Sequence, residues 1–164
     1  MKGIVIKYSD ENINTDLIIP ARYLNKSEPE YLAEHCFEDF DYKFKEKREK
    51  LNATILIAGK NFGSGSSREH APIAIKASGI DCVIAPTFAR IFFRNSINIG
   101  LTLIEFDGIE NLKDGDVLEI DFDTGSLKNI SINQIFEIKK IPKFLQDIIA
   151  SEGLVNYAKN LLRE

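Results

Sequence analysis

The sequence has 164 residues, 44% hydrophobic and 28% charged, which is ordinary for a globular protein. This length suits one domain over residues 1–164, large enough to bury a core. The 25 acidic residues outnumber the 21 basic ones, so no basic excess is available to neutralise nucleic-acid phosphates. No apolar run approaches the roughly 20 residues of a membrane span, and Met1-Lys2 precedes an alternating segment, not the apolar stretch of a secretion signal. We therefore expect a cytoplasmic protein with neither nucleic acid nor membrane as partner.

An opening strand and a polar loop come first. Residues 2–8 alternate in polarity, which predicts a strand. The Asx-rich loop that follows ends at Asp16, directly before the compact apolar stretch 17–19. Asp16 is therefore either a helix-capping or Asx-turn residue or a member of a functional site.

Two helices are expected next. Pro29 follows Ser27 by two residues and Glu30 follows it by three, which predicts a serine-capped helix over residues 31–37. The charged run 41–50 is interpreted as the solvated face of a second helix and not as a nucleic-acid patch.

A glycine-rich loop is the most distinctive stretch of the chain. A buried strand is predicted at 54–58, the loop spans 59–72, and the body of a helix covers 73–77. Three glycines within seven residues let the backbone adopt positive φ and approach a ligand closely. The loop brings two serine hydroxyls and the guanidinium of Arg68 to a helix N-terminus, where unpaired N–H groups favour an anion. The stretch therefore predicts an anion-binding loop that contains serines.

Two well-known glycine loops do not fit this stretch. The phosphate loop of nucleotide hydrolases needs Lys-Ser or Lys-Thr after its last glycine, whereas Ser66 follows Gly65. The dinucleotide fingerprint needs a small residue where Arg68 stands. A plain structural turn does not require this run of glycine, serine, arginine and histidine, so a functional site is the preferred interpretation.

The middle of the chain predicts a parallel sheet. Further strands are expected at 82–85 and 102–105, on either side of a helix over 88–98. The strand–helix–strand order implies parallel strands joined by right-handed crossovers. Ligands of such sheets bind beyond the carboxyl ends of the strands, and the glycine-rich loop leaves one of these ends.

The last fifty residues no longer alternate between buried strands and helices. Short strands at 117–121 and 126–132 flank Asp123-Thr124-Gly125, which predicts a hairpin. Two amphipathic helices are expected to close the chain, at 144–151 and 154–162. The predicted fold class is therefore α/β, with parallel strands, flanking helices, a C-terminal hairpin and closing helices.

No metal ligands are predicted in this chain. Cys36 and Cys82 are far apart, and neither belongs to a Cys-x-x-Cys motif that could hold zinc or an iron–sulfur cluster. We expect two buried free thiols. His35 is expected to be an ordinary helix residue and not a ligand.

Three blocks of sequence resemble the swivel domain of the aconitase superfamily. They are NFGSGSSREHA at 61–71, NTDLIIPARYL at 14–24 and TFARIFFRN at 87–95. The first block is highly specific for the superfamily, and the resemblance covers nearly the whole chain. The free-standing short form of this domain is the small subunit of the isopropylmalate dehydratases.

The resemblance implies a swivelling β/β/α fold that carries half of a shared active site. The implied activity is that of a hydro-lyase small subunit, which isomerises 2-isopropylmalate and 3-isopropylmalate through an unsaturated intermediate in leucine biosynthesis. The implied partner is a large subunit that holds a 4Fe-4S cluster, and the substrate is a small hydroxy-dicarboxylic acid. No cofactor is expected in this chain.

The resemblance also implies roles for individual residues. Ser66 is implied as the base that takes a proton and returns it, with Asp16 beside it as an orienting residue. Glu69 and His70 are expected to cap or position the helix. The residues expected to bind the substrate are Ser67, Arg68, Arg22 and Ser64, with a surface ion pair as the alternative for Arg22. The segment expected to set substrate specificity is Tyr23, Leu24, Asn25 and Lys26.

Two other functions stay open. Asn25 and Lys26 are polar, which keeps a related hydro-lyase for homoaconitate- or dimethylmalate-type acids in view. The second is a binding module that holds a carboxylate or phosphate without chemistry. Ser66 alone is a poor base, because a free hydroxyl keeps its proton far above neutral pH. It needs backbone N–H groups and a positive charge such as Arg68 to stabilise its alkoxide.

Overall fold

The structure is a computed structural model, and it describes residues 1–163. Its centre is a seven-stranded sheet with the order β4-β3-β2-β1-β5-β6-β7. The parallel half consists of β1 (Lys2–Lys7), β2 (Ile55–Ile57), β3 (Cys82–Ala85) and β4 (Thr102–Glu105). The antiparallel half consists of β5 (Val117–Asp121), β6 (Ser126–Asn129) and β7 (Gln134–Glu137). The strand β1 joins the halves, since it pairs parallel with β2 and antiparallel with β5.

The parallel strands are buried on both faces, which explains their apolar sequences. In β2, Ile55 and Ile57 face one hydrophobic core and Leu56 faces the other. In β3, Val83 and Ile84 divide between the two cores in the same way. The parallel strands therefore form a middle layer between two cores.

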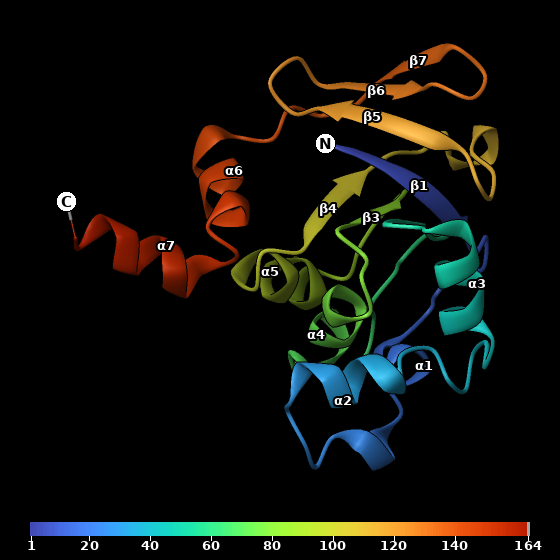
Figure 1. Cartoon of the computed structure of the whole chain (residues 1–164). Coiled ribbons are helices and arrows are strands. Elements are labelled where there is room, and N and C mark those ends of the chain that lie inside the picture. Colours follow the sequence, from blue (N-terminus) through green and yellow to red (C-terminus); the bar gives the residue numbers. More distant parts are fainter. Residues whose placement is uncertain (164) are drawn as a thin grey trace.

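Helices cover the core that contains Leu56 and Val83, which is called the first core below. They are α1 (Thr15–Ile18), α2 (Pro29–Glu34), α3 (Phe44–Leu51), α4 (His70–Ala77) and α5 (Arg90–Asn98). Short 3-10 turns lie at Ala21–Tyr23 and Ile109–Asn111. In Figure 1, α1, α2 and α4 gather at the end of the molecule opposite β5, β6 and β7.

The antiparallel strands cover the core that contains Ile55 and Ile57, which is called the second core below. Leu118, Ile120 and Leu127 from β5 and β6 pack there with residues of the parallel strands. The result is three layers, made of helices, parallel strands and a smaller curled sheet. The predicted α/β class and the parallel order of the central strands are confirmed.

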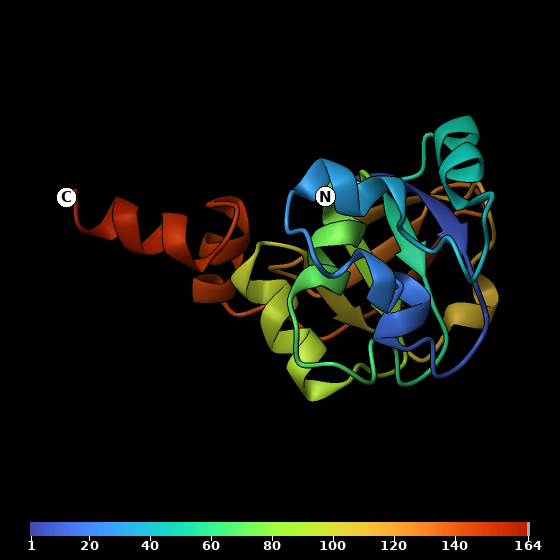
Figure 2. The ribbon, with the colours of Figure 1, turned by 90° about the horizontal axis from the view of Figure 1, so that it is seen from below.

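Two further helices follow the sheet, within one residue of their predicted limits. The helix α6 (Lys143–Ala150) packs beside α5, and α7 (Leu154–Leu161) follows after Gly153. Figures 1 and 2 both show α7 projecting from the rest of the molecule, and none of its residues is buried.

Two details of the prediction are wrong. The N-cap of α2 is Glu28 and not Ser27, and no side chain caps that helix, because Pro29 starts it one residue later. The predicted strand 126–132 ends at Asn129, and a turn with Asn133 at φ 52° leads into β7. The predicted hairpin is therefore the first part of a three-stranded meander.

Gly63 provides a test of the packing beneath the loop. Its φ is +80°, and an added Cβ would lie 2.2 Å from Cγ of Phe92. Gly115 has φ +82°, but the nearest atom to its added Cβ is 3.9 Å away. We expect Gly115→Ala to lower the free energy of unfolding by about 1–2 kcal/mol through backbone strain, and Gly63→Ala by roughly 1–3 kcal/mol more through overpacking. Urea unfolding of the isolated chain measures both, and equal losses would contradict this account.

Candidate active site

The glycine-rich loop leaves the carboxyl end of β2 and enters α4, as the sequence predicts. Gly63 and Gly65 both have positive φ, at +80° and +113°. An added Cβ on Gly65 would lie 2.8 Å from Oγ1 of Thr15, so glycine allows the loop to approach α1 closely. The glycines therefore set both the shape and the position of the loop.

Backbone hydrogen bonds join the loop to the segment before α1. The N–H of Gly63 donates to the carbonyl of Ile13 at 2.8 Å, and the N–H of Thr15 donates to the carbonyl of Ser64 at 2.8 Å. The N–H of Ser66 donates to Oγ1 of Thr15 at 2.9 Å. Two of the three sequence blocks thus lie side by side.

The third block holds the loop from the other side. Phe62 and Phe88 form a parallel bridge. The side-chain amide of Asn95 in α5 donates to the carbonyl of Ser67 at 2.8 Å. All three blocks therefore meet around residues 62–67.

A shallow depression lies where the loop, α1 and α4 meet. Asp16, Ser66 and Arg68 all line it, together with Leu24. The Oγ of Ser66 accepts a hydrogen bond from the N–H of Arg68 at 3.2 Å. Within residues 1–163, Arg68 has no ion-pair partner, so its guanidinium is available to an anion. The depression offers a hydroxyl, a carboxylate and a cation to a small ligand.

The remaining predicted residues take different places. Ser64 contributes its carbonyl to the hydrogen bond with Thr15, and Ser67 is exposed beside the depression. Asp16 is exposed in the first turn of α1. The N-cap of that helix is Asn14, whose side chain accepts from the N–H of Leu17, so the capping alternative for Asp16 is wrong.

Arg22 forms an ion pair on the surface. Its two terminal nitrogens lie 2.6 and 2.7 Å from the two carboxylate oxygens of Asp39. These hydrogen bonds raise the pKa of Arg22 and lower the pKa of Asp39. Arg22 does not line the depression in this structure, and the predicted surface pair is the arrangement that the structure shows.

The predicted specificity segment is fastened by aromatic contacts. Tyr23 stacks on His35, with ring centroids 3.7 Å apart. A hydrogen bond from His35 lowers the pKa of Glu38, which also accepts from the Tyr23 hydroxyl at 3.0 Å. Lys26 lies over the ring of Tyr31, and Asn25 is exposed. Leu24 alone of the four predicted residues 23–26 lines the depression.

Metal binding is not supported in the part of the chain that the structure describes. No group of three or more His, Cys, Asp or Glu side chains could hold a metal ion there. Cys36 and Cys82 are free and buried, as predicted, and burial raises the pKa of both thiols. Over residues 1–163 no helix is both long and apolar enough to span a membrane.

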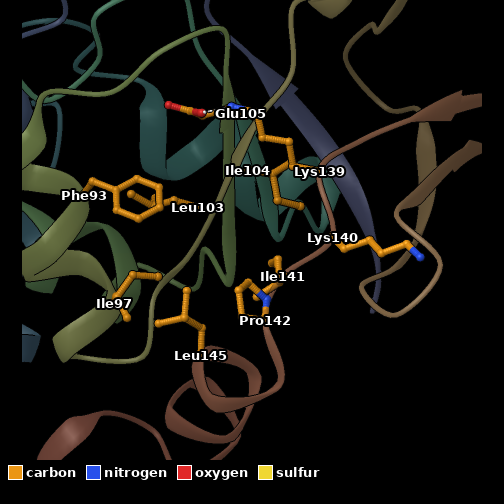
Figure 3. Close-up of a pocket in the computed structure, with 10 residues that line it drawn as sticks. All are labelled: Phe93, Ile97, Leu103, Ile104, Glu105, Lys139, Lys140, Ile141, Pro142 and Leu145. Atoms are coloured by element: carbon orange, nitrogen blue, oxygen red, sulfur yellow. Dashed lines mark hydrogen bonds and ion pairs between the residues drawn. The ribbon is translucent and has the colours of Figure 1, made fainter.

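A second hollow has the wrong chemistry for an active site. It encloses about 150 Å³ between α5, β4 and the start of α6. Figure 3 shows the apolar side chains of Phe93, Ile97 and Leu145 around it, while Lys140 points away. Lys139 is paired with Glu105 at 2.9 Å. The hollow thus offers an apolar lining and no serine, and it lies apart from the glycine-rich loop.

Sequence reasoning did not single out two residues that shape the site. Thr15 and Asn95 each bind the loop through a side chain, at positions 51 and 28 residues away along the chain. Both stand inside quoted sequence blocks, but nothing local indicates which atoms they contact.

Thr15 tests how the loop is held. We expect Thr15→Val to lower the free energy of unfolding by about 1–3 kcal/mol, because the N–H of Ser66 would lose its acceptor. Thr15→Ser keeps the hydroxyl and is the matched control, with a smaller loss. Chemical unfolding and hydrogen exchange of the Ser66 amide measure the effect. Unchanged exchange in Thr15→Val would show that this hydrogen bond does not hold the loop.

Comparisons with known proteins agree with this geometry. Residues 1–108 match the family described as the Aconitase C-terminal domain. Proteins named 3-isopropylmalate dehydratase small subunit match over 98% of both chains in Ruminiclostridium cellulolyticum (56% identity over 162 residues) and Clostridium botulinum (55% over 161 residues). The crystal structure of 3-isopropylmalate dehydratase from Methanocaldococcus jannaschii is similar with a TM-score of 0.87 and 42% identity, covering 98% of this chain and 93% of that one. The chain therefore belongs to the family of 3-isopropylmalate dehydratase small subunits and has the swivel fold of the aconitase superfamily.

Proposed function

We propose that this chain supplies the serine-bearing half of an active site shared with a large subunit. The assembled enzyme interconverts 2-isopropylmalate and 3-isopropylmalate by dehydration and rehydration, a step of leucine biosynthesis in the cytoplasm. Residues 1–164 act as one swivel domain. The names of the relatives support the activity, and their designation as small subunits supports a large partner.

The hydrogen bond at Ser66 is the observation that carries this proposal. A serine hydroxyl becomes an effective base only where its alkoxide is stabilised. Here Oγ of Ser66 already accepts from the N–H of Arg68 at 3.2 Å, just before the N-terminus of α4. The Arg68 guanidinium and the helix dipole add positive potential at the same place. Ser66 therefore takes the proton from the substrate carbon and later returns it.

The other residues around the depression bind and orient the substrate. Arg68, which has no ion-pair partner within residues 1–163, presents a planar fork suited to a carboxylate. Ser67 and Ser64 lie on either side of Ser66 in the same loop and complete the carboxylate site. Asp16 faces the depression from α1 and orients groups by hydrogen bonding.

The 4Fe-4S cluster belongs to the proposed partner and not to this chain. Cys36 lies in the first core and Cys82 in the second, so the two thiols cannot ligate one cluster. The described residues contain no other ligand group of the required size. The contribution of this chain is therefore to bind the substrate, orient it and move its proton.

An apolar side chain favours the isopropyl substrate over homoaconitate-type acids. Because Asn25 and Lys26 are polar, the sequence leaves homoaconitate- and dimethylmalate-type acids as alternative substrates. Neither side chain lines the depression, whereas Leu24 does. A leucine matches a branched alkyl group better than it matches an additional carboxylate.

Turnover of 3-isopropylmalate by separated and mixed subunits tests the proposed function. We expect no activity from this chain alone or from the large subunit alone, and activity from the mixture. The large subunit is prepared anaerobically, and formation of the unsaturated acid is followed by absorbance. An inactive mixture, with a verified cluster and a detected complex, would contradict the proposal.

The same assay separates catalysis from simple anion binding. Ser66→Ala should lower kcat by roughly 10²–10⁴-fold with little change in KM, because a base acts mainly in the transition state. Ser126→Ala, in β6 and outside the site, is the control and should behave as wild type. Full activity in Ser66→Ala would favour a binding module without chemistry.

Arg22 can contact a substrate carboxylate only by leaving Asp39. If it does so in the complex, Asp39→Asn should lower KM by a few-fold at most, because Arg22 would no longer have to break an exposed ion pair. Arg22→Gln should raise KM. Steady-state kinetics of the two mixed complexes measure both changes. Unchanged KM values would leave Arg22 with its surface pair alone.

A further inference from the structure

His70 is a half-buried residue with buried ring nitrogens that neither the fold nor the proposed mechanism uses. It is the first residue of α4. Within the described part of the chain, both of its ring nitrogens are buried without a hydrogen-bond partner. The predicted capping role does not explain it, because the N-cap of α4 is Glu69 and no side chain caps that helix.

An unpartnered imidazole is unfavourable in a packed site. A neutral histidine has one donor and one acceptor nitrogen, and burying both without partners destabilises the fold. Such groups are few in native proteins and often have a functional reason. Over residues 1–163, the other buried side-chain atoms of this kind are the hydroxyls of Ser96 and Thr102, in α5 and β4.

The position of His70 indicates where its partner lies. His70, Ser66 and Asp16 line the same depression, along with Arg68. The Oγ of Ser66 accepts from the N–H of Arg68, and within the described residues no side chain donates to it. The Ser66 oxygen can accept a second hydrogen bond, and His70 has a ring N–H without an acceptor.

Building on the proposed function, we infer that His70 is a positioning residue for Ser66. In the closed, substrate-bound complex a ring N–H of His70 donates a hydrogen bond to the Ser66 alkoxide oxygen. This bond fixes the Oγ rotamer, so that an oxygen lone pair points at the substrate C–H bond. Asp16 and Arg68 line the same depression as the ring.

A pair of His70 variants separates positioning from packing. His70→Leu removes the buried ring nitrogens, so the melting temperature of the free chain should not fall below that of wild type. In the mixed holoenzyme the same variant should lower kcat by about 10²-fold, with KM within about threefold, because the carboxylate contacts are unchanged. His70→Gln keeps a donor and should recover most of the lost kcat.

Thr102→Val is the matched control. It removes a buried, unpartnered hydroxyl from β4, outside the site, and should leave kcat unchanged. Wild-type kcat in His70→Leu would overturn the inference while the proposed function stood. A lower melting temperature with equal activity loss in His70→Leu and His70→Gln would assign a packing role and also overturn it. An inactive wild-type mixture would overturn the proposed function, and this role with it.

Discussion

The site depends on the hydrogen bonds between residues 13–15 and the glycine-rich loop. The connection between β2 and α4 runs from residue 58 to residue 69, which is long for a strand-to-helix loop. Its buried backbone groups need partners, and the carbonyl of Ile13 and the hydroxyl of Thr15 accept from two of its N–H groups. Because Thr15 also opens α1, the same contacts place Asp16 beside Ser66.

Much of the fold could be predicted because its signals are local. The apolar runs that became β2, β3 and β4, the helix α5 and the two closing helices follow from periodicity and from glycine stops. Errors arose where a short-range signal was ambiguous. Pro29 displaced the start of α2 from Ser27, and the segment 126–132 carried no strong break before Asn133 turned the chain into β7.

The sequence predicted residues that the structure brings together, but not the contacts that hold them in place. Ser66, Arg68 and Asp16 were identified from their sequence blocks, and the structure brings them to one depression. The hydrogen bonds of Thr15 and Asn95 and the ion pair of Arg22 with Asp39 depend on which segments meet in space. No periodicity or motif specifies such contacts. The buried state of the His70 ring could also be seen only in three dimensions.

The two cysteines have a practical consequence for handling this protein. Both thiols are enclosed in hydrophobic cores, and burial raises their pKa, so neither presents a thiolate to oxidants. The folded chain therefore offers no readily oxidised thiol at these two positions. Any loss of activity in air would then have to arise elsewhere than at Cys36 and Cys82.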